Sequence, residues 1–421
     1  MFNEIYELLK KHRRHGENFI WRSIQYIGKM VLDLLVFYII VRLLTPEKFG
    51  QYSYLIALVG LFVTFGNFGL STSVSKYIAE YQVKDEAKVK SILFSSLILS
   101  TLFCFIVSIA IFILGFFFFF DYYEFVGYLV TLIFLISGSN ILDGVYRGLM
   151  KFKKLSFVSI ISFIIRIPLT YFFVLYFEIT GALWAQIFFY IISFVLLILY
   201  SKQKSLIFDK KIALEVFKYA IVIGIAGLAY FLYTNIDILF LEHYGYIIEI
   251  GDYKIASRFL ELTYILFVVL GQVLAPAITK LVTRKQFVKF RKLLSKLTYI
   301  FGLGIIISIL SYFIFPISIQ IFFPEYYSTN ILLIWNLLLF LIPFKCVGVI
   351  LIQGFLVPAG LGKITMQLTL IGGISNVILD YLFIEWFGFL GIIYSTLIIH
   401  SITICLTFII FYRKISGKWS Y

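Results

Sequence analysis

Apolar stretches long enough to cross a membrane follow one another along almost the whole chain. A transmembrane helix needs about 20 mostly apolar residues. Hydrophobic residues make up 62% of this 421-residue sequence and charged residues only 14%, and the mean hydropathy is +1.00. So few polar residues cannot cover a soluble domain, and no polar block is large enough for a folded domain outside the membrane. We therefore predict an all-α polytopic membrane protein.

Twelve apolar windows, each bounded by charged residues, glycine or proline, predict twelve transmembrane helices. They cover residues 20–43, 50–74, 91–118, 125–147, 156–177, 181–201, 216–240, 256–281, 294–315, 329–351, 364–385 and 390–412. The polar residues 1–19 are expected to form a tail before the first helix. No cleavable signal peptide is expected there.

Basic residues are concentrated in alternate loops. With twelve spans, one set of loops holds 28 lysines and arginines, and the other set holds four, together with nine acidic residues. The positive-inside rule places the basic loops and both termini in the cytoplasm. The net charge of +14 therefore indicates orientation in the cell membrane, and we expect no binding of nucleic acid.

The two halves of the sequence share short motifs in the same order, at offsets from 201 to 210. Gly50-Gln-Tyr52 matches Gly251-Asp-Tyr253, Arg147-Gly148 matches Gln353-Gly354, and Tyr171 with Gly181 matches Tyr381 with Gly391. Because six spans per half is an even number, the halves are predicted to be parallel repeats about a pseudo-two-fold axis along the membrane normal. We predict two six-helix lobes, 1–206 and 207–421, with a cavity between them that allows alternating access.

Seven polar residues inside the predicted spans are candidates for function, because an ionisable side chain at bilayer depth costs about 2.5 to 3.5 kcal/mol unless it faces a cavity or a partner. Predicted substrate contacts are Arg166, Lys345, Lys29, Asp380 and Asn376, and predicted coupling or gating groups are Asp33 and Asp237.

Arg166 is about 16 Å from the cytoplasmic end of its span at 1.5 Å per residue. Its guanidinium suits two-pronged binding of a phosphate, and the alternative is a structural pair with Asp143 or another acid. Lys29 and Asp33 are four residues apart on one helix face and can neutralise one another. Alternatively, Asp33 binds a proton or Na⁺.

Lys345 follows Pro343, which can kink its helix toward a cavity, although its side chain could instead extend to the interface. Asp237, Asp380 and Asn376 lie in the outer halves of their spans. Two roles are possible for these residues: polar contact with a sugar head, or a gate between the lobes.

The sequence contains no motif for enzymatic chemistry. It has neither a phosphate-binding loop of the Gly-x4-Gly-Lys-Ser/Thr type nor a His or Cys spacing for a metal, and its loops are short. Cys104, Cys346 and Cys405 lie in apolar stretches and are expected to be buried thiols. We predict a transporter and no enzyme, with no cofactor; H⁺ or Na⁺ coupling stays open.

The segment from Val41 to Tyr81, VRLLTPEKFGQYSYLIALVGLFVTFGNFGLSTSVSKYIAEY, resembles the opening signature of polysaccharide-biosynthesis membrane proteins. That signature is Arg-Leu-Leu, a Pro-Glu-x-Phe-Gly-x-Tyr turn, and a Gly-rich span that ends in Lys-Tyr-Ile-Ala-Glu. The second half begins similarly, with Asn235-Ile-Asp237 and Gly251-Asp-Tyr253. The chain is similar to Wzx-type flippases of the multidrug/oligosaccharidyl-lipid/polysaccharide (MOP) exporter superfamily, and a MATE-like fold is implied.

The resemblance implies a flippase, acting as a monomer, that moves polyprenyl-phosphate-linked or pyrophosphate-linked oligosaccharide from the cytoplasmic to the outer leaflet. Membrane lipids and polysaccharide-assembly enzymes would be its partners. A cation-coupled multidrug exporter is the alternative, because Asp33 resembles the first-helix acid of such exporters. A cavity that contains Arg166 and Lys345 as well as acids favours an anionic substrate, and hence the flippase. A membrane-embedded sugar polymerase is disfavoured by the short loops.

Overall fold

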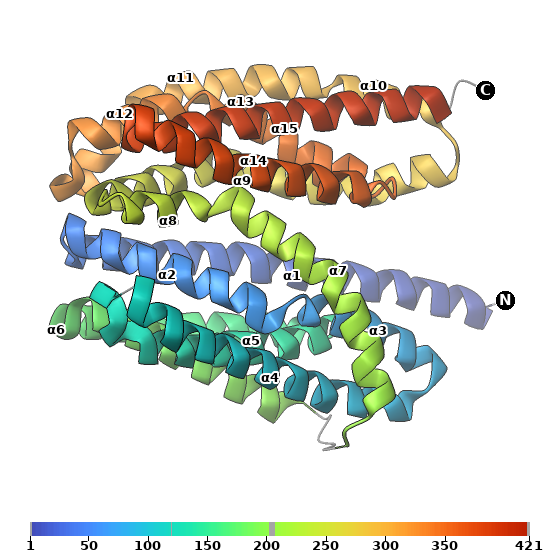
Figure 1. Ribbon diagram of the computed structural model, residues 1–421. Coiled ribbons are helices and arrows are strands. Elements are labelled where there is room, and N and C mark those ends of the chain that lie inside the picture. Colours follow the sequence, from blue (N-terminus) through green and yellow to red (C-terminus); the bar gives the residue numbers. More distant parts are fainter. Residues whose placement is uncertain (1, 119, 202–206, 419–421) are drawn as a thin grey trace. The chain divides into compact units, whose positions relative to one another are not determined.

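The computed structural model describes residues 2–118, 120–201 and 207–418 (Figure 1). Throughout these segments the regular structure is helical, as predicted. The described chain divides into two compact units, unit 1 with Met1–Lys48 and Leu55–Leu228, and unit 2 with Phe49–Tyr54 and Ala229–Tyr421. The division falls within a helix, after Leu228, and the two six-helix lobes 1–206 and 207–421 stay a prediction.

The helices of unit 1 are α1 (Phe2–Leu43), α2 (Pro46–Asn67), α3 (Leu70–Lys84), α4 (Glu86–Phe118), the short 3₁₀ helix η1 (Phe120–Phe125), α5 (Val126–Gly148), α6 (Phe152–Tyr200) and most of α7 (Lys210–Thr234). Those of unit 2 are α8 (Ile236–His243), α9 (Ile247–Thr283), α10 (Phe287–Ser295), α11 (Leu297–Phe322), η2 (Pro324–Tyr326), α12 (Thr329–Leu338), α13 (Leu341–Ile350), the π-helical η3 (Leu351–Leu356), α14 (Gly362–Phe387) and α15 (Phe389–Lys418).

Ten helical segments among the described residues are long and apolar enough to cross a membrane. An eleventh is obtained if Thr329–Leu338 and Leu341–Leu356, which meet at a bend of 47°, count as one broken span. The chain is therefore a multi-pass membrane protein. A total of twelve spans and the cytoplasmic position of the termini stay predictions.

The second predicted span, 50–74, ends earlier than expected. Thr45 caps the start of α2 by accepting a hydrogen bond from the Lys48 N–H, and Pro46 occupies the first helical turn, a position that suits proline. The helix stops at Asn67 because Phe68 and Gly69 adopt left-handed φ angles of 33° and 77°. A side chain at Gly69 would also meet the Ala220 carbonyl oxygen at 2.5 Å. The Gly-rich stretch is thus a break between α2 and α3.

Two predicted spans, 156–177 and 181–201, lie in the 49-residue helix α6, which is interrupted at Glu178 (φ 50°, ψ −121°). Beyond this break, Gly181 packs so closely on the Phe173 carbonyl that a Cβ atom would overlap it. Gly391 at the start of α15 packs in the same way on the Phe383 carbonyl. Both pairs are offset by 210 residues, so the repeated sequence motif corresponds to a repeated backbone geometry.

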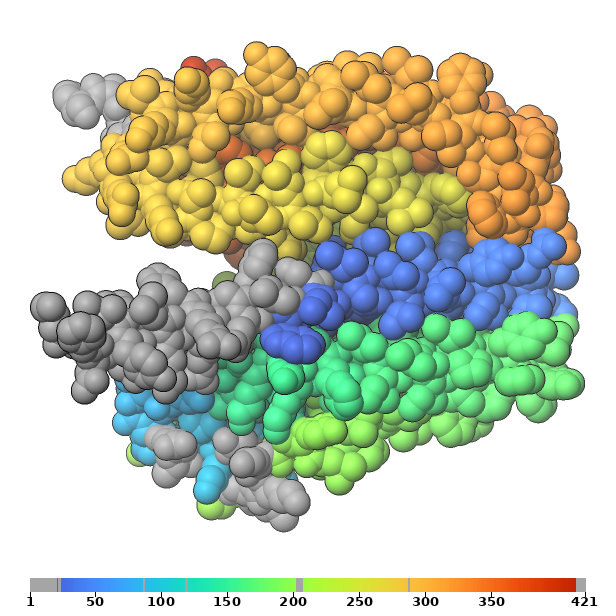
Figure 2. All heavy atoms as spheres, turned by 180° about the vertical axis from the view of Figure 1, so that it is seen from behind, coloured from blue at the N-terminus to red at the C-terminus, as the bar shows by residue number. Residues whose placement is uncertain are grey.

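Each unit buries apolar side chains inside and exposes others outside. The core of unit 1 lies among α3, α4, α5, α6 and the start of α7, and its fully buried members include Val74, Ile78, Ile92, Ile141 and Val216. The outer surface is also apolar: on α11, shown in orange on the face in Figure 2, Ile309 and Phe313 are 57% and 63% exposed. Such a surface is suited to contact with lipid.

Candidate functional site

Six polar side chains meet in the interior of unit 2, and we call them the buried polar cluster. They are Asp237 of α8, Tyr253 of α9, Asn376 and Asp380 of α14, and Ser395 and Thr396 of α15. All six are buried; Asp380 and Asn376 are 0% and 1% exposed. The cluster therefore brings together three of the residues predicted from the sequence, Asp237, Asn376 and Asp380.

Hydrogen bonds connect the members of the cluster across four helices. The Asn376 amide donates to Asp237 Oδ1 at 2.7 Å and to Asp380 Oδ2 at 3.3 Å. The Tyr253 hydroxyl donates to Asp237 Oδ2 at 2.6 Å, and Thr396 donates to the same oxygen at 3.1 Å. Ser395 donates to Asp380 Oδ1. Two carboxylates are thus held by neutral donors, with no Lys or Arg in the hydrogen-bonded set.

Local backbone features position these side chains. The chain breaks between α7 and α8 at Asn235, which places Asp237 in the first turn of α8. On α14, a Cβ atom at Gly373 would lie 2.7 Å from the Ala229 carbonyl oxygen, so glycine allows α14 to approach the end of α7 closely. One turn later, Asn376 reaches the Leu232 carbonyl at 3.4 Å as well as Asp237.

The cluster has the chemistry of a site for a proton or a small hard cation. Two buried carboxylates close to one another cannot both stay charged without a compensating positive charge. Oxygen is the ligand that hard cations prefer, and the Asn376 Oδ1 atom is buried with no hydrogen-bond donor among the described residues. Asp380 and Asn376, predicted to contact the substrate, lie in this interior cluster, and their contact with substrate stays a prediction.

Arg166 lies in the interior of unit 1, next to Asp33. The Nη1 atom is 3.8 Å from Asp33 Oδ1, and the exposed fractions of the two side chains are 9% and 40%. The guanidinium carbon is 5.1 Å from the ring centroid of Phe189 and 5.7 Å from that of Phe163. Its Nε is buried without a hydrogen-bond acceptor among the described residues. Arg166 is therefore shielded by aromatic rings and only loosely paired.

The structure separates the alternatives for the other unit 1 charges. Asp143, one proposed partner of Arg166, pairs instead with Arg147 of the same helix, at 2.6 Å. Asp33 forms an ion pair with Arg166, 133 residues away, and Lys29 is exposed on α1.

Lys345 contacts a histidine of another helix of unit 2. Its Nζ atom lies 2.9 Å from Nδ1 of His400, a residue of α15 that is only 5% exposed. The Tyr233 ring lies edge-on to the imidazole, with 4.2 Å between the two ring centroids. His400 was not among the residues predicted from the sequence, because it belongs to no His or Cys spacing typical of a metal site. The available signal was a histidine within an apolar span, one turn after the polar pair Ser395 and Thr396.

The family described as polysaccharide biosynthesis protein has a model that matches residues 15–282, more than half of the chain. Among curated proteins no match was found.

Three solved structures share the fold over 94% of this chain. An inward-facing multidrug resistance MATE family transporter of the MOP superfamily has a TM-score of 0.76 at 16% identity, with 98% of that chain covered. Lipid II flippase MurJ, in an inward closed conformation, has a TM-score of 0.70 at 19% identity, with 87% covered. A MOP superfamily transporter from Pyrococcus furiosus has a TM-score of 0.60 at 16% identity, with 94% covered. This chain belongs to the polysaccharide biosynthesis protein family.

Proposed function

We propose that this protein flips a polyprenyl-phosphate-linked or pyrophosphate-linked oligosaccharide from the cytoplasmic to the outer leaflet of the plasma membrane, by alternating access, for the assembly of cell-surface polysaccharide. Membership of the family and the MOP fold, which is shared with lipid II flippase MurJ, support this class of function. The single observation that supports the anionic lipid head as substrate is the state of Arg166.

Arg166 has the properties of a phosphate contact. Its distance of 3.8 Å from Asp33 exceeds the 2.7–3.2 Å of a normal N–H···O hydrogen bond, so the guanidinium retains donors for another anion. The rings of Phe163 and Phe189, tilted by 54° to one another, lie beside the guanidinium, and an apolar neighbourhood of this kind strengthens an electrostatic contact. A phosphate oxygen would take the place of the distant Asp33 carboxylate, and Lys29, exposed on the same helix as Asp33, would add positive charge.

The buried polar cluster supplies the coupling step in this proposal. Asp237 and Asp380, bridged by Asn376, would bind a proton or Na⁺. Occupation of the cluster changes the charge that α8, α14 and α15 share, and hence the packing of these helices. Asp33 is a second coupling group, because release of Arg166 to a phosphate leaves its carboxylate without that partner.

A vesicle assay tests the function. Purified protein in liposomes is given fluorescent lipid-linked oligosaccharide in one leaflet, and its arrival in the other leaflet is measured; a cationic dye is offered in parallel. We expect protein-dependent flipping of the lipid and no dye export. The buried carboxylates favour a second candidate, a cation-coupled exporter of drugs, and dye export without lipid flipping would establish that candidate in place of the flippase.

A further inference from the structure

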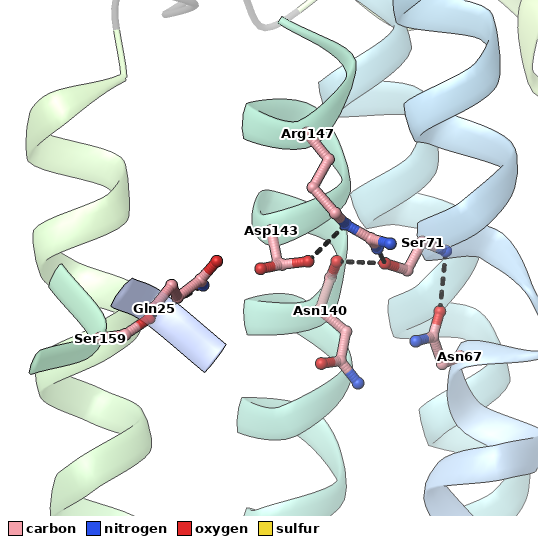
Figure 3. Close-up of polar contacts among 7 residues, drawn as sticks. All are labelled: Gln25, Asn67, Ser71, Asn140, Asp143, Arg147 and Ser159. Atoms are coloured by element: carbon pink, nitrogen blue, oxygen red, sulfur yellow. Dashed lines mark hydrogen bonds and ion pairs between the residues drawn. The ribbon is translucent and has the colours of Figure 1, made fainter. Parts of the chain in front are cut away.

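A second group of polar side chains lies in unit 1, and Figure 3 shows it. We call it the amide face. Its members are Gln25 of α1, Asn67 and Ser71 at the break between α2 and α3, Asn140, Asp143 and Arg147 of α5, and Ser159 of α6. In the figure, the ends of the Gln25 and Asp143 side chains point toward one another. Neither the predicted phosphate contacts nor the buried polar cluster includes any of these residues.

The centre of the amide face is rigid and neutral. The Arg147 Nε atom lies 2.6 Å from Asp143 Oδ2, and its Nη2 donates to Ser71 Oγ at 2.8 Å. Ser71 in turn donates to the Asn140 carbonyl oxygen at 2.5 Å, and its backbone N–H donates to Asn67 Oδ1 at 3.1 Å. The one positive charge is thus paired with the one negative charge, and the side chains are fixed in place.

The side-chain amide of Asn140 has no hydrogen-bond partner among the described residues, although its backbone carbonyl has one. Asn140 is half-buried, and it lies about 12 Å from the end of its span at Gly148, at 1.5 Å per residue. An amide that meets hydrocarbon without a partner is costly. This amide therefore faces water or a polar ligand.

We propose that the amide face binds hydroxyl groups of the sugars in the substrate head. This inference rests on the proposed function and assigns residues to the sugar part of the substrate. Amides, a carboxylate, a guanidinium and a serine hydroxyl together offer both donors and acceptors, as hydroxyl groups require. A phosphate is the less suitable ligand, because the charge of Arg147 is already matched by Asp143, whereas Arg166 is only loosely paired.

The spacing along two helices agrees with this division of the head. Ser159 precedes Arg166 on α6, and Gln25 precedes Asp33 on α1, by about two turns or about 11 Å in each case. Two contacts therefore join α1 and α6. Gln25 donates to Ser159 at 3.2 Å, and about two turns later on both helices Asp33 pairs with Arg166. The phosphate portion of the substrate head would then lie at Arg166, and the sugar portion would lie at the amide face.

Binding to the purified full-length protein in nanodiscs tests the proposal with two probes. One is undecaprenyl pyrophosphate without sugar, and the other is lipid-linked oligosaccharide extracted from the native host membranes. Asn140→Ala should weaken binding of the glycosylated probe about two- to tenfold, as expected for one lost hydrogen bond, and leave the sugar-free probe unchanged. Asn140→Gln, which keeps an amide, should recover part of the affinity. Arg166→Gln should weaken binding of both probes.

Thr131→Val is the matched control, because Thr131 is an exposed residue of the same helix whose hydroxyl bonds its own Gly127 carbonyl. It should change neither affinity. The proposal is overturned if Asn140→Ala affects both probes equally or neither, or if the wild-type protein does not prefer the glycosylated probe. If Asn140→Ala does not insert, Asn140→Ser is measured against the same criteria. Failure of the proposed function would be distinct: the glycosylated probe would bind selectively and the vesicle assay would show no flipping.

Discussion

The side-chain amide of Asn376 bridges Asp237 and Asp380, at 2.7 Å and 3.3 Å, and so ties the short helix α8 to α14 inside unit 2. The bridge connects two carboxylates that come from segments 143 residues apart in the chain. A cation bound at the two carboxylates would change the strength of this bridge. In the proposed mechanism, the same three side chains would then link ion binding to helix packing in unit 2.

Neutralising the carboxylates should remove ion coupling. Asp237→Asn and Asp380→Asn keep the size of the side chain and lose its charge, so the cluster can no longer exchange a proton or Na⁺. A stimulation of flipping by an imposed gradient of pH or Na⁺, of the order of tenfold for a typical coupling free energy, should disappear in both variants. The flipping rate in liposomes, with and without each gradient, is the measurement.

Asn330→Ala is the control for this prediction, because Asn330 bonds Glu249 in the same unit, outside the cluster. Stimulation should persist in that variant. If Asp237→Asn keeps the full response to both gradients, the cluster is not the coupling site.

Removing the Arg166 charge should weaken recognition of the phosphate. Hydrogen bonds to charged groups contribute about 1.5–3 kcal/mol, so Arg166→Gln should lower kcat/KM for lipid-linked oligosaccharide about 10- to 100-fold. Arg166→Lys should be intermediate, because a lysine cannot bind in two-pronged fashion. Arg258→Gln is the control, since Arg258 pairs with Glu261 at 2.9 Å in unit 2. Full activity of Arg166→Gln would exclude Arg166 from the substrate path.

The sequence pointed to the charged members of the buried polar cluster and to Arg166 and Asp33. Arg166, Asp33, Asp237 and Asp380 stood out because charge is expensive at bilayer depth. It could not identify Ser395 and Thr396, because hydroxyl side chains in membrane helices commonly bond their own backbone; Thr396 also donates to the Ile392 carbonyl. Only tertiary contact with the carboxylates distinguishes these residues from ordinary helix serines and threonines.

Local spacing was a poor guide to partners where a distant helix competes. Lys29 and Asp33 are one turn apart, yet Asp33 lies beside Arg166 of α6. The predicted end of the second span was wrong for a related reason. The pattern of apolar residues cannot show that the backbone turns left-handed at Phe68 and Gly69 and ends the helix there. Both features depend on neighbouring helices, which the pattern of a single segment does not contain.

Lys345 and His400 should be energetically coupled. His400→Leu leaves the Lys345 ammonium without its acceptor, and Lys345→Met leaves the buried imidazole without its donor, so each change should cost about 1–3 kcal/mol. The double variant replaces both polar groups and should cost less than the sum of the single changes, by about 0.5–3 kcal/mol. Thermal unfolding in detergent measures this cycle. Additive single effects would show that the 2.9 Å contact contributes nothing.

The contact between α3 and α7 should make stability depend on alkaline pH. The Tyr81 hydroxyl donates to the Glu215 carboxylate at 2.8 Å, which raises the pKa of Tyr81 from 10.0 to about 12. Because this pKa is higher in the folded state, its contribution is complete below about pH 10 and is lost as the pH rises through about 12. Tyr81→Phe should flatten the stability profile in this window. An unchanged profile in the variant would contradict the assignment.

The repeated glycine geometry can be tested in both halves of the chain at once. A methyl group at Gly181 or Gly391 would overlap the carbonyl oxygen of Phe173 or Phe383, and overpacking of this kind costs about 1–3 kcal/mol. Gly181→Ala and Gly391→Ala should therefore lower the thermal unfolding temperature by similar amounts. Gly302→Ala on α11 has no atom within 4 Å of the added Cβ, and it should stabilise the protein slightly, because alanine is the better helix former. If only one of the two variants lowered the unfolding temperature, the matching motifs would not have the same structural role. The internal repeat would then be supported by the sequence alone.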